Sequence, residues 1–381
     1  MKNFYYILFF VCFISKAQPY AIGHTTITFV DASRNNRNIA TEIYYPANVA
    51  GNNVGVATTS ELFPVLSFGH GFLMGYDAYQ NFWETLVPNG YVIAFPKTEG
   101  SAFPSHTNFA KDLAFVIDEM ILLNNNSSSI FYNKLSNTNC VMGHSMGGGA
   151  ATLAMQYSSA ITSLCTFAAA ETNPSAIAVC PTITVPSLVI AGQNDCVTPP
   201  STNQLAMYNG IASDCKTYIS INGGSHCQMA NSNFMCSTGE ATCSPQATIT
   251  RAFQHEVIFD YLIHWLDAEL KANCVSGNVF DNSITSDSRI TYAKNCFLCP
   301  ALSTTVFEDK DLKIFPNPFI DKINVISENE IYIIVTDALG KRVFEKNNFK
   351  NLEINTTNWL SGMYFIEIFS NTKRETLKLI K

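Results

Sequence analysis

Apolar and polar side chains follow a regular pattern over the first three quarters of the chain. Residues 25–46 alternate position by position and predict two antiparallel strands. Residues 63–68 and 90–95 are continuous apolar runs, which are typical of parallel strands buried on both faces. Residues 77–88, which separate the two runs, have the spacing of a helix. The chain therefore begins with an antiparallel pair and passes into strands that alternate with helices.

The alternation continues to about residue 271. Further strands are predicted at 139–142, 163–169, 187–191 and 216–221, and further helices at 110–124, 149–155 and 249–271. Strands that alternate with helices form a mostly parallel sheet covered on both faces. Residues 18–300 are therefore predicted to be one α/β domain.

The composition changes after Cys299. Residues 301–311 are predicted to be a linker. Residues 312–381 contain short alternating runs, such as 331–335 and 363–368, separated by glycine turns, and predict a small all-β, sandwich-like module.

The first residues carry the signature of an export signal. A charged tip at 1–3 precedes an apolar run at 4–14, and Ser15-Lys16-Ala17 supplies small residues for cleavage. Residues 1–17 are therefore interpreted as a signal peptide, too short for a membrane span. We expect a secreted or surface-located monomer with no membrane span in the mature chain.

The charge narrows the class of partner. The chain has 381 residues and a net charge of −7. Residues 18–304 hold 10 basic and 19 acidic side chains, whereas residues 305–381 hold 11 of each. An acidic main domain without a basic patch argues against a nucleic-acid partner.

The cysteines agree with export. Of 12 cysteines, Cys12 leaves with the signal peptide, so an odd number remains and at least one thiol is unpaired. Cys140 and Cys165 lie in apolar runs and are the candidate free thiols. Loop-like sequence surrounds the candidates for disulfides, which include Cys196, Cys227, Cys236 and Cys243. Cys296-x-x-Cys299 lacks a second ligand pair for zinc, so no metal or cofactor is expected.

The candidate chemistry centres on Gly143-His144-Ser145-Met146-Gly147. A serine in G-x-S-x-G between a strand and a helix sits on a sharp turn that exposes its hydroxyl. Such a serine needs a histidine base and an acid, which follow it along the chain in the order acid, base. Ser145 is therefore the candidate nucleophile.

Two loops after Ser145 supply the candidate partners. Asp195 follows the strand at 187–191 and is the candidate acid, with Glu171 as runner-up. His226 ends the glycine-rich loop Ile221-Asn222-Gly223-Gly224-Ser225-His226 and is the candidate base. His255 and His264 also follow Ser145, but the predicted long helix holds them as surface or packing residues.

The loop after the strand at 63–68 supplies the remaining parts. The backbone N–H groups of Phe72 and Met146 are the candidate oxyanion hole. The side chains of Phe72, Met74, Tyr76 and Met146 are predicted to line an apolar substrate-binding cleft, although Met74 and Tyr76 could equally pack within the loop. His70 and His144 are interpreted as structural. No lid-like insertion is seen, and an open cleft suits bulky or polymeric esters.

Together these motifs resemble bacterial cutinase-like polyester hydrolases, including poly(ethylene terephthalate) hydrolases. The resemblance covers most of residues 25–300 and implies an α/β-hydrolase fold, the triad Ser145, Asp195 and His226, and ester or polyester substrates. The chain departs from it in two places. No tryptophan stands in residues 171–175, where these enzymes carry one for aromatic substrates, and the loop at 227–248 is longer and rich in cysteine.

The resemblance also bears on the disulfides. Some relatives tie the acid and base loops together, which would pair Cys196 with Cys227, with Cys236 and Cys243 as other partners. A terminal disulfide of the family would join Cys274 to Cys296 or Cys299.

The tail resembles a second family. Ile314-Phe315-Pro316-Asn317-Pro318, Asp337-Ala338-Leu339-Gly340-Lys341, Leu360-Ser361-Gly362-Met363-Tyr364 and the basic end Lys378-Leu379-Ile380-Lys381 look like a Bacteroidetes-type type IX secretion sorting domain. That implies a partner in the type IX secretion machinery.

The sequence thus predicts a secreted serine esterase of the cutinase and poly(ethylene terephthalate) hydrolase kind. The alternatives are a lipase or serine peptidase of the same fold, or a non-catalytic surface or adhesion protein on a hydrolase scaffold.

Overall fold

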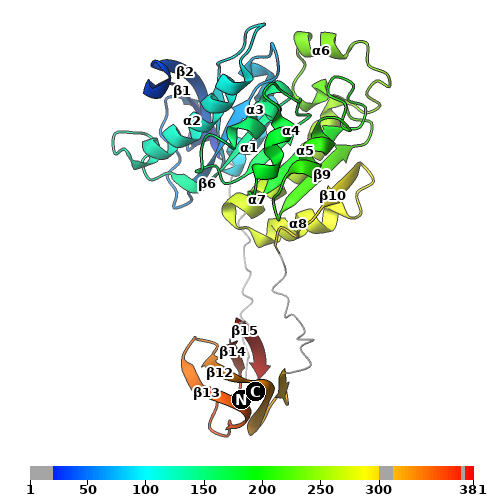
Figure 1. Cartoon of the computed structure of the whole chain (residues 1–381). Helices are drawn as coiled ribbons and strands as arrows, with labels where there is room; N and C mark the ends of the chain where they lie inside the picture. Colours follow the sequence, from blue (N-terminus) through cyan, green and yellow to red (C-terminus); the bar gives the residue numbers. More distant parts are fainter. Residues whose placement is uncertain (1–19, 300–311, 370–373) are drawn as a thin grey trace, which may run out of the picture. The chain divides into compact units, whose positions relative to one another are not determined.

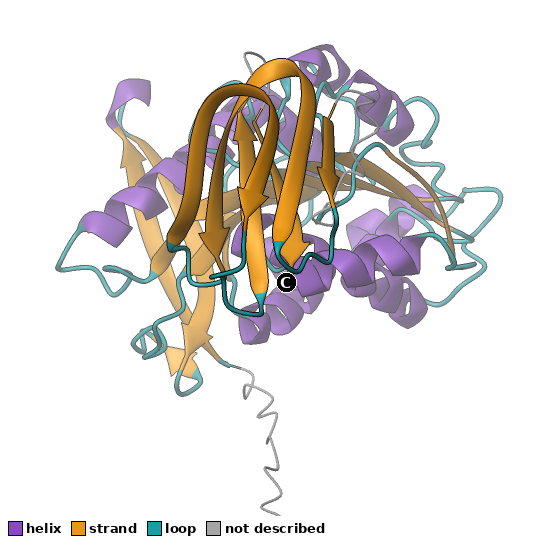
Figure 2. Cartoon of the chain, turned by 90° about the horizontal axis from the view of Figure 1, so that it is seen from below, coloured by secondary structure: helices purple, strands orange, loops and turns teal. Residues whose placement is uncertain are grey.

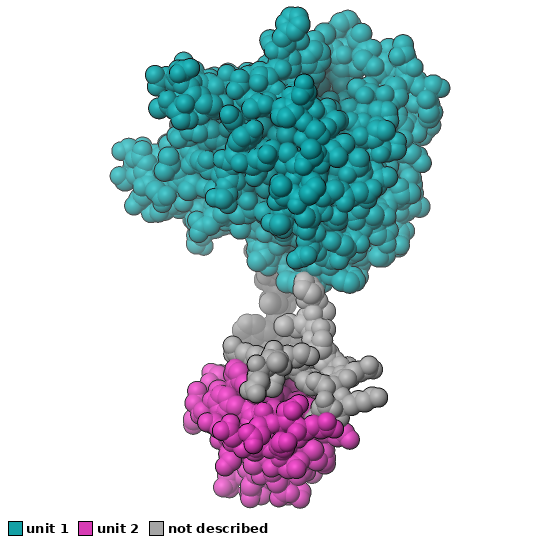
Figure 3. Space-filling view, in the orientation of Figure 1, with its two compact units in different colours: residues 1–299 teal, residues 300–381 magenta. Residues whose placement is uncertain are grey.

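The computed structural model describes residues 20–299, 312–369 and 374–381 (Figure 1). The predicted signal peptide at 1–17 and the predicted linker at 301–311 lie outside the described residues. Contacts divide the chain into two compact units at Cys299 and Pro300, coloured separately in Figure 3. In the described residues, helices occur only in the first unit, and the second consists of strands and loops (Figure 2).

The first unit is built on one ten-stranded sheet with the order β10-β9-β8-β7-β6-β4-β5-β2-β1-β3. Its six central strands run parallel, from β5 at one side to β9 at the other. They are β4 (Phe63–Gly69), β5 (Val92–Pro96), β6 (Leu135–His144), β7 (Leu164–Phe167), β8 (Ser187–Gly192) and β9 (Lys216–Ile221). The predicted mostly parallel sheet is confirmed.

Antiparallel strands flank the parallel centre. β1 (Ala21–Asp31) and β2 (Arg37–Ala47) pair over their full length, as the alternating pattern predicts, and β2 joins β5. The short β3 (Gly51–Asn52) closes that edge. At the other edge β10 (Ile290–Lys294) runs antiparallel to β9, a strand that the sequence analysis did not predict.

Helices cover both faces because the strands are apolar on both. Adjacent residues such as Val65 and Leu66 point into different cores. One core packs against α2 (His106–Asn125), α3 (Met146–Ala154), α4 (Ala176–Val179) and α5 (Gln204–Gly210). The other packs against α1 (Gln80–Leu86), α7 (Arg251–Lys271) and α8 (Cys274–Ile284). This is the α/β-hydrolase arrangement, with short 3-10 turns at Ala32–Arg34, Tyr76–Tyr79, Val87–Asn89, Cys180–Thr182 and Cys227–Met229.

A short helix and two disulfides occupy the long loop after β9. Helix α6 (Phe234–Glu240) stands at the upper edge of the first unit in Figure 1 and contributes no fully buried residue. Cys227 pairs with Cys236, and Cys196 pairs with Cys243. The direct Cys196–Cys227 tie does not form, and Cys243 and Cys236 are instead the partners, which are the alternatives that the sequence left open.

Two more disulfides fasten the end of the first unit. Cys274 pairs with Cys299, one of the two predicted alternatives. Cys296 pairs with Cys215, which the sequence analysis did not single out. Because Cys296 and Cys299 both lie in disulfides, neither offers a thiolate for zinc. Cys140 and Cys165 are free and buried, as predicted, and Cys180 is also free and buried.

The second unit is a five-stranded antiparallel sheet. It comprises β11 (Leu312–Phe315), β12 (Lys322–Asp337), β13 (Arg342–Asn355), β14 (Met363–Phe369) and β15 (Arg374–Ile380). The long β12 pairs with β11, β13 and β14, and its alternate residues Ile323, Val325, Ile333 and Val335 fill a separate core. The predicted all-β module is confirmed.

Candidate active site

The turn between β6 and α3 places Ser145 at the carboxyl edge of the sheet. Ser145 has a φ of 56° and a ψ of −122°, a conformation that L residues rarely adopt. The turn also needs glycine, since a Cβ on Gly147 would lie 2.1 Å from the carbonyl oxygen of Gly69, and one on Gly143 would lie 2.4 Å from that of Gly147. This close packing fixes the direction of the Ser145 hydroxyl.

Three side chains meet at this turn in one line of hydrogen bonds. The Nε2 atom of His226 lies 2.9 Å from the Oγ atom of Ser145. The Nδ1 atom of His226 lies 2.8 Å from the Oδ2 atom of Asp195. All three residues are buried, with His226 and Asp195 only 2% and 4% exposed. The fold therefore joins the three predicted residues from loops after β6, β8 and β9.

The alternative candidates for the acid and the base are not part of this line of hydrogen bonds. Glu171 accepts a hydrogen bond from the N–H of Ile177. The Nε2 atom of His255 contacts the carbonyl oxygen of Ala230 at 3.2 Å, and His264 lies on the same helix, α7.

Asp195 is held by a threonine that the sequence analysis did not identify. The backbone N–H of Thr198 donates to Oδ1 of Asp195 at 2.8 Å, and its hydroxyl donates to Oδ2 at 2.8 Å. The same hydroxyl lies 3.1 Å from Nδ1 of His226 and accepts from Nε2 of Gln204 at 2.9 Å. The carboxylate is thus fully hydrogen-bonded in a buried place, which keeps one oxygen directed at the imidazole.

The loop that carries His226 is braced from α7. The side-chain amide of Gln254 accepts from the N–H of Ser225 and donates to its carbonyl oxygen, both at 2.9 Å. The guanidinium of Arg251 donates to the carbonyl oxygens of Cys227 and Ala230. No sequence motif marks Gln254 or Arg251, because both lie in an otherwise ordinary amphipathic helix.

The loop after β4 lies beside Ser145. The His70 ring is buried, with its two nitrogens each 2.9 Å from a carbonyl oxygen, that of Gly71 and that of Thr98.

Met146 is the first residue of α3, where a backbone N–H has no acceptor within the helix and remains available for a ligand. The structure thus sets Met146 at the amino end of a helix directly after Ser145.

The four predicted cleft residues differ in their exposure. Phe72 is 46% exposed, whereas Met146 and Met74 are each 4% exposed. The sulfur of Met74 lies 3.4 Å from the hydroxyl of Tyr79. Met74 and Tyr76 also line a cavity of about 410 Å³ between this loop and Lys97, and Lys97 stands over the Tyr76 ring. Phe72 is therefore the most accessible of the four.

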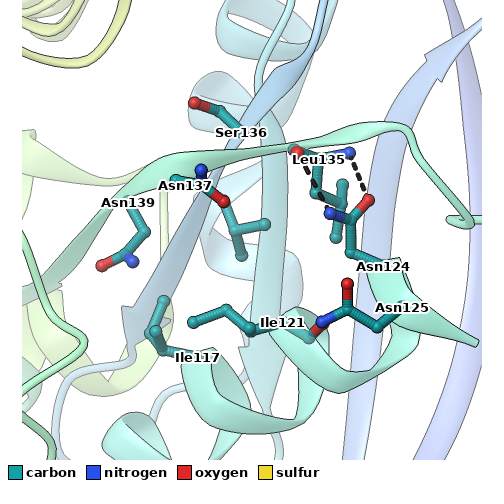
Figure 4. Close-up of a pocket in the computed structure, with 9 residues that line it drawn as sticks. Ile117, Ile121, Asn124, Asn125, Leu135, Ser136, Asn137 and Asn139 are labelled. Carbon is teal, nitrogen blue, oxygen red and sulfur yellow. Dashed lines mark hydrogen bonds between the residues drawn. The ribbon is translucent and has the colours of Figure 1, made fainter.

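A smaller cavity lies at the amino ends of the parallel strands, away from Ser145. It occupies about 40 Å³ between α2 and the start of β6 (Figure 4). The amide of Asn124 is bonded to the backbone N–H and carbonyl of Leu135, and no titratable side chain lines the space. The amide of Asn139 is likewise bonded to the backbone of Ala160 and Thr162, which fits a packing gap rather than a reactive site.

Two comparisons define the families. Residues 15–242 match the PET hydrolase-like family, and the chain belongs to that family. Residues 313–381 match the secretion system C-terminal sorting domain, here the type IX kind. No curated protein matches the chain.

Within the described residues, no helix is both long and apolar enough to cross a membrane. Together with four disulfides, the sorting domain indicates a secreted or cell-surface hydrolase.

Proposed function

We propose that this protein is a serine carboxylic ester hydrolase that cleaves esters, including polyesters, through an acyl-enzyme on Ser145. The observation that carries the proposal is the line of hydrogen bonds from Ser145 through His226 to Asp195. The family supports a hydrolase of ester bonds, and the site supplies the groups that such a reaction needs.

The reaction proceeds in two halves. His226 Nε2 takes the proton of the Ser145 hydroxyl as Oγ attacks the ester carbonyl carbon, and the same nitrogen then returns the proton to the departing alcohol. Water next attacks the acyl-enzyme and gives its proton to His226, which passes it to Ser145 Oγ as the carboxylic acid leaves. The N–H groups of Phe72 and Met146 stabilise the negative oxygen in each half.

The accessible Phe72 ring favours bulky esters and polymer chains. No tryptophan stands at 171–175, so we expect soluble esters and aliphatic polyesters to be cleaved faster than aromatic polyesters.

The test replaces the nucleophile. We expect Ser145→Ala to abolish hydrolysis of a short-chain nitrophenyl ester and labelling by a fluorophosphonate, while Ser163→Ala, another buried serine, leaves both intact. Full activity of the Ser145→Ala protein would refute the proposal. A wild-type protein that neither hydrolyses esters nor reacts with the fluorophosphonate would indicate a non-catalytic scaffold. Product release from a polyester film tests the polymer substrate.

A further inference from the structure

A chain of buried hydrogen bonds connects the loop after β4 to the carbonyl of His226. The N–H of Gly71 donates to the hydroxyl of Tyr79 at 2.7 Å. That hydroxyl lies 2.9 Å from Nδ1 of His144, and Nε2 of His144 lies 3.1 Å from the carbonyl oxygen of His226. Tyr79 and His144 are fully buried. None of these contacts belongs to the line from Ser145 to Asp195.

The two ends of the chain fix the direction of every hydrogen bond in it. The carbonyl oxygen of His226 can only accept, so Nε2 of His144 carries the proton. Nδ1 of His144 is then an acceptor, and the hydroxyl of Tyr79 donates a hydrogen bond to it. The N–H of Gly71 can only donate, and the oxygen of Tyr79 accepts it. A neutral His144 therefore satisfies all four groups in a single arrangement.

Burial keeps His144 in this neutral form. Burial lowers the pKa of His144 well below its usual value, and the neighbouring His226 lowers it further. The centres of the two rings are 4.8 Å apart. Burial also raises the pKa of Tyr79, so its hydroxyl keeps the proton that it donates.

The Gly71 end of the chain has no free space. A Cβ on Gly71 would lie 2.7 Å from the sulfur of Met74, 3.2 Å from the hydroxyl of Tyr79 and 3.3 Å from Nδ1 of His144. Gly71 directly precedes Phe72, the candidate oxyanion donor. The place of the Phe72 N–H is therefore set by groups that also contact the base loop.

We propose that Tyr79 and His144 are positioning residues that hold the Phe72 N–H and the His226 ring in fixed places around Ser145. This inference rests on the proposed function. The side chains of both residues are fully buried and their hydrogen bonds reach the backbone of Gly71 and the carbonyl of His226, so they act through these groups. Small displacements of such groups lower the rate without abolishing binding.

The experiment removes one hydroxyl. We expect Tyr79→Phe to lower kcat/KM for a nitrophenyl ester about tenfold, measured well below its melting temperature. Affinity for an alkyl boronic acid, whose serine adduct resembles the tetrahedral intermediate, should fall by about the same factor. The matched control is Tyr45→Phe, because Tyr45 is equally buried and its hydroxyl donates to the carbonyl of Val54 at 2.7 Å, away from the site. Tyr45→Phe should lower the melting temperature but change kcat/KM less than about twofold.

A second variant covers the case in which Tyr79→Phe does not fold. His144→Phe keeps a ring at the turn but removes both of its hydrogen bonds, and we expect a loss of kcat/KM of about tenfold or more. When both variants fold, their combination should be no more than about twofold worse than the poorer single variant, since the two residues act as one unit. Multiplied losses in the double variant would overturn the inference.

Wild-type kinetics separate this inference from the proposed function. If the wild-type protein hydrolyses the ester and Tyr79→Phe keeps its kcat/KM and its boronate affinity, only the positioning role is wrong. If the wild-type protein does not hydrolyse any ester, the proposed function itself fails.

Discussion

Single buried groups around the site have effects that can be measured separately. The hydroxyl of Thr198 donates to Asp195 and lies against His226. We expect Thr198→Val, which keeps the shape but loses the hydroxyl, to lower kcat/KM about tenfold, since the carboxylate loses one of the bonds that orient it. Thr198→Ser should restore most of the rate in the same ester assay.

Thr217 is the matched control for this change. Its hydroxyl is buried on β9 and has no hydrogen-bond partner among the residues that the structure describes. Removing an unpaired buried polar atom does not cost stability. Thr217→Val should therefore leave the rate unchanged and keep or raise the melting temperature. Equal kinetics for the two valine variants would show that Thr198 has no role in orientation.

The carboxyl of Glu269 makes stability depend on pH. Burial raises the pKa of Glu269 to about 7 from an ordinary value of 4.5. As pH rises between these values the unfolded chain loses the proton while the folded chain keeps it, so the free energy of unfolding decreases with rising pH. Glu269→Gln should remove this decrease and stabilise the protein at pH 8. We expect a gain of only about 1–2 kcal/mol in the free energy of unfolding, because Glu269 keeps some contact with solvent, which weakens the effect.

Urea unfolding at pH 5 and pH 8 measures the difference. Glu84→Gln, at an exposed position on α1, serves as the control and should shift neither curve. The same pH dependence in the wild type and in Glu269→Gln would assign it to another group.

At the scale of elements, the two disulfides of the long loop should differ in their contribution to stability. Cys196–Cys243 closes 47 residues of chain and Cys227–Cys236 only 9. A longer closed loop restricts the unfolded chain more, which corresponds to about 4 and about 3 kcal/mol respectively. Replacing Cys196 and Cys243 by alanine should therefore lower the urea midpoint more than replacing Cys227 and Cys236.

Both double variants should also lose ester turnover, because each disulfide begins at the residue after Asp195 or His226. Unchanged kcat/KM in either double variant would show that the disulfide does not help to position Asp195 or His226.

The sequence predicted the elements whose pattern is repeated over many residues. The parallel strands, α2 and α7 were expected within a few residues of their ends because their apolar faces are continuous. In contrast, α8 and β10 were missed. β10 is a five-residue edge strand with one buried residue, Ile290, and owes its conformation to pairing with β9, which no local signal records.

The residues of the candidate site likewise divide into those that a local sequence motif identifies and those that it does not. Ser145 and its glycines form a local motif, and the order of the three catalytic candidates along the chain follows from the fold, so the amino-acid sequence is enough to propose them; their roles stay predictions. Thr198, Tyr79 and Gln254 could not be identified, because an unremarkable side chain gains its function only when distant loops meet. The Cys215–Cys296 pair was missed for the same reason.

At the scale of the whole molecule, the two units have separate cores, and the groups of the candidate site lie between residues 71 and 254. We expect a chain that ends at Cys299 to keep the kcat/KM of the full chain for a soluble ester. Expressed in its natural host, that shortened chain should remain inside the outer membrane, since it lacks the sorting domain at 313–381. Immunoblots of cell and medium fractions measure this, and secretion of the shortened chain would contradict it.

The positions of the cysteines have a consequence for the newly made protein. Among the residues that the structure describes, the three free thiols lie between Cys140 and Cys180, and the four disulfides lie between Cys196 and Cys299. The strands that carry Ser145 thus need no oxidant to form, whereas the loops that carry Asp195 and His226 are fastened by disulfides only beyond the cytoplasm. Under the proposed function the newly made chain is therefore a latent precursor, and we expect the reduced protein to cleave esters more slowly than the oxidised one.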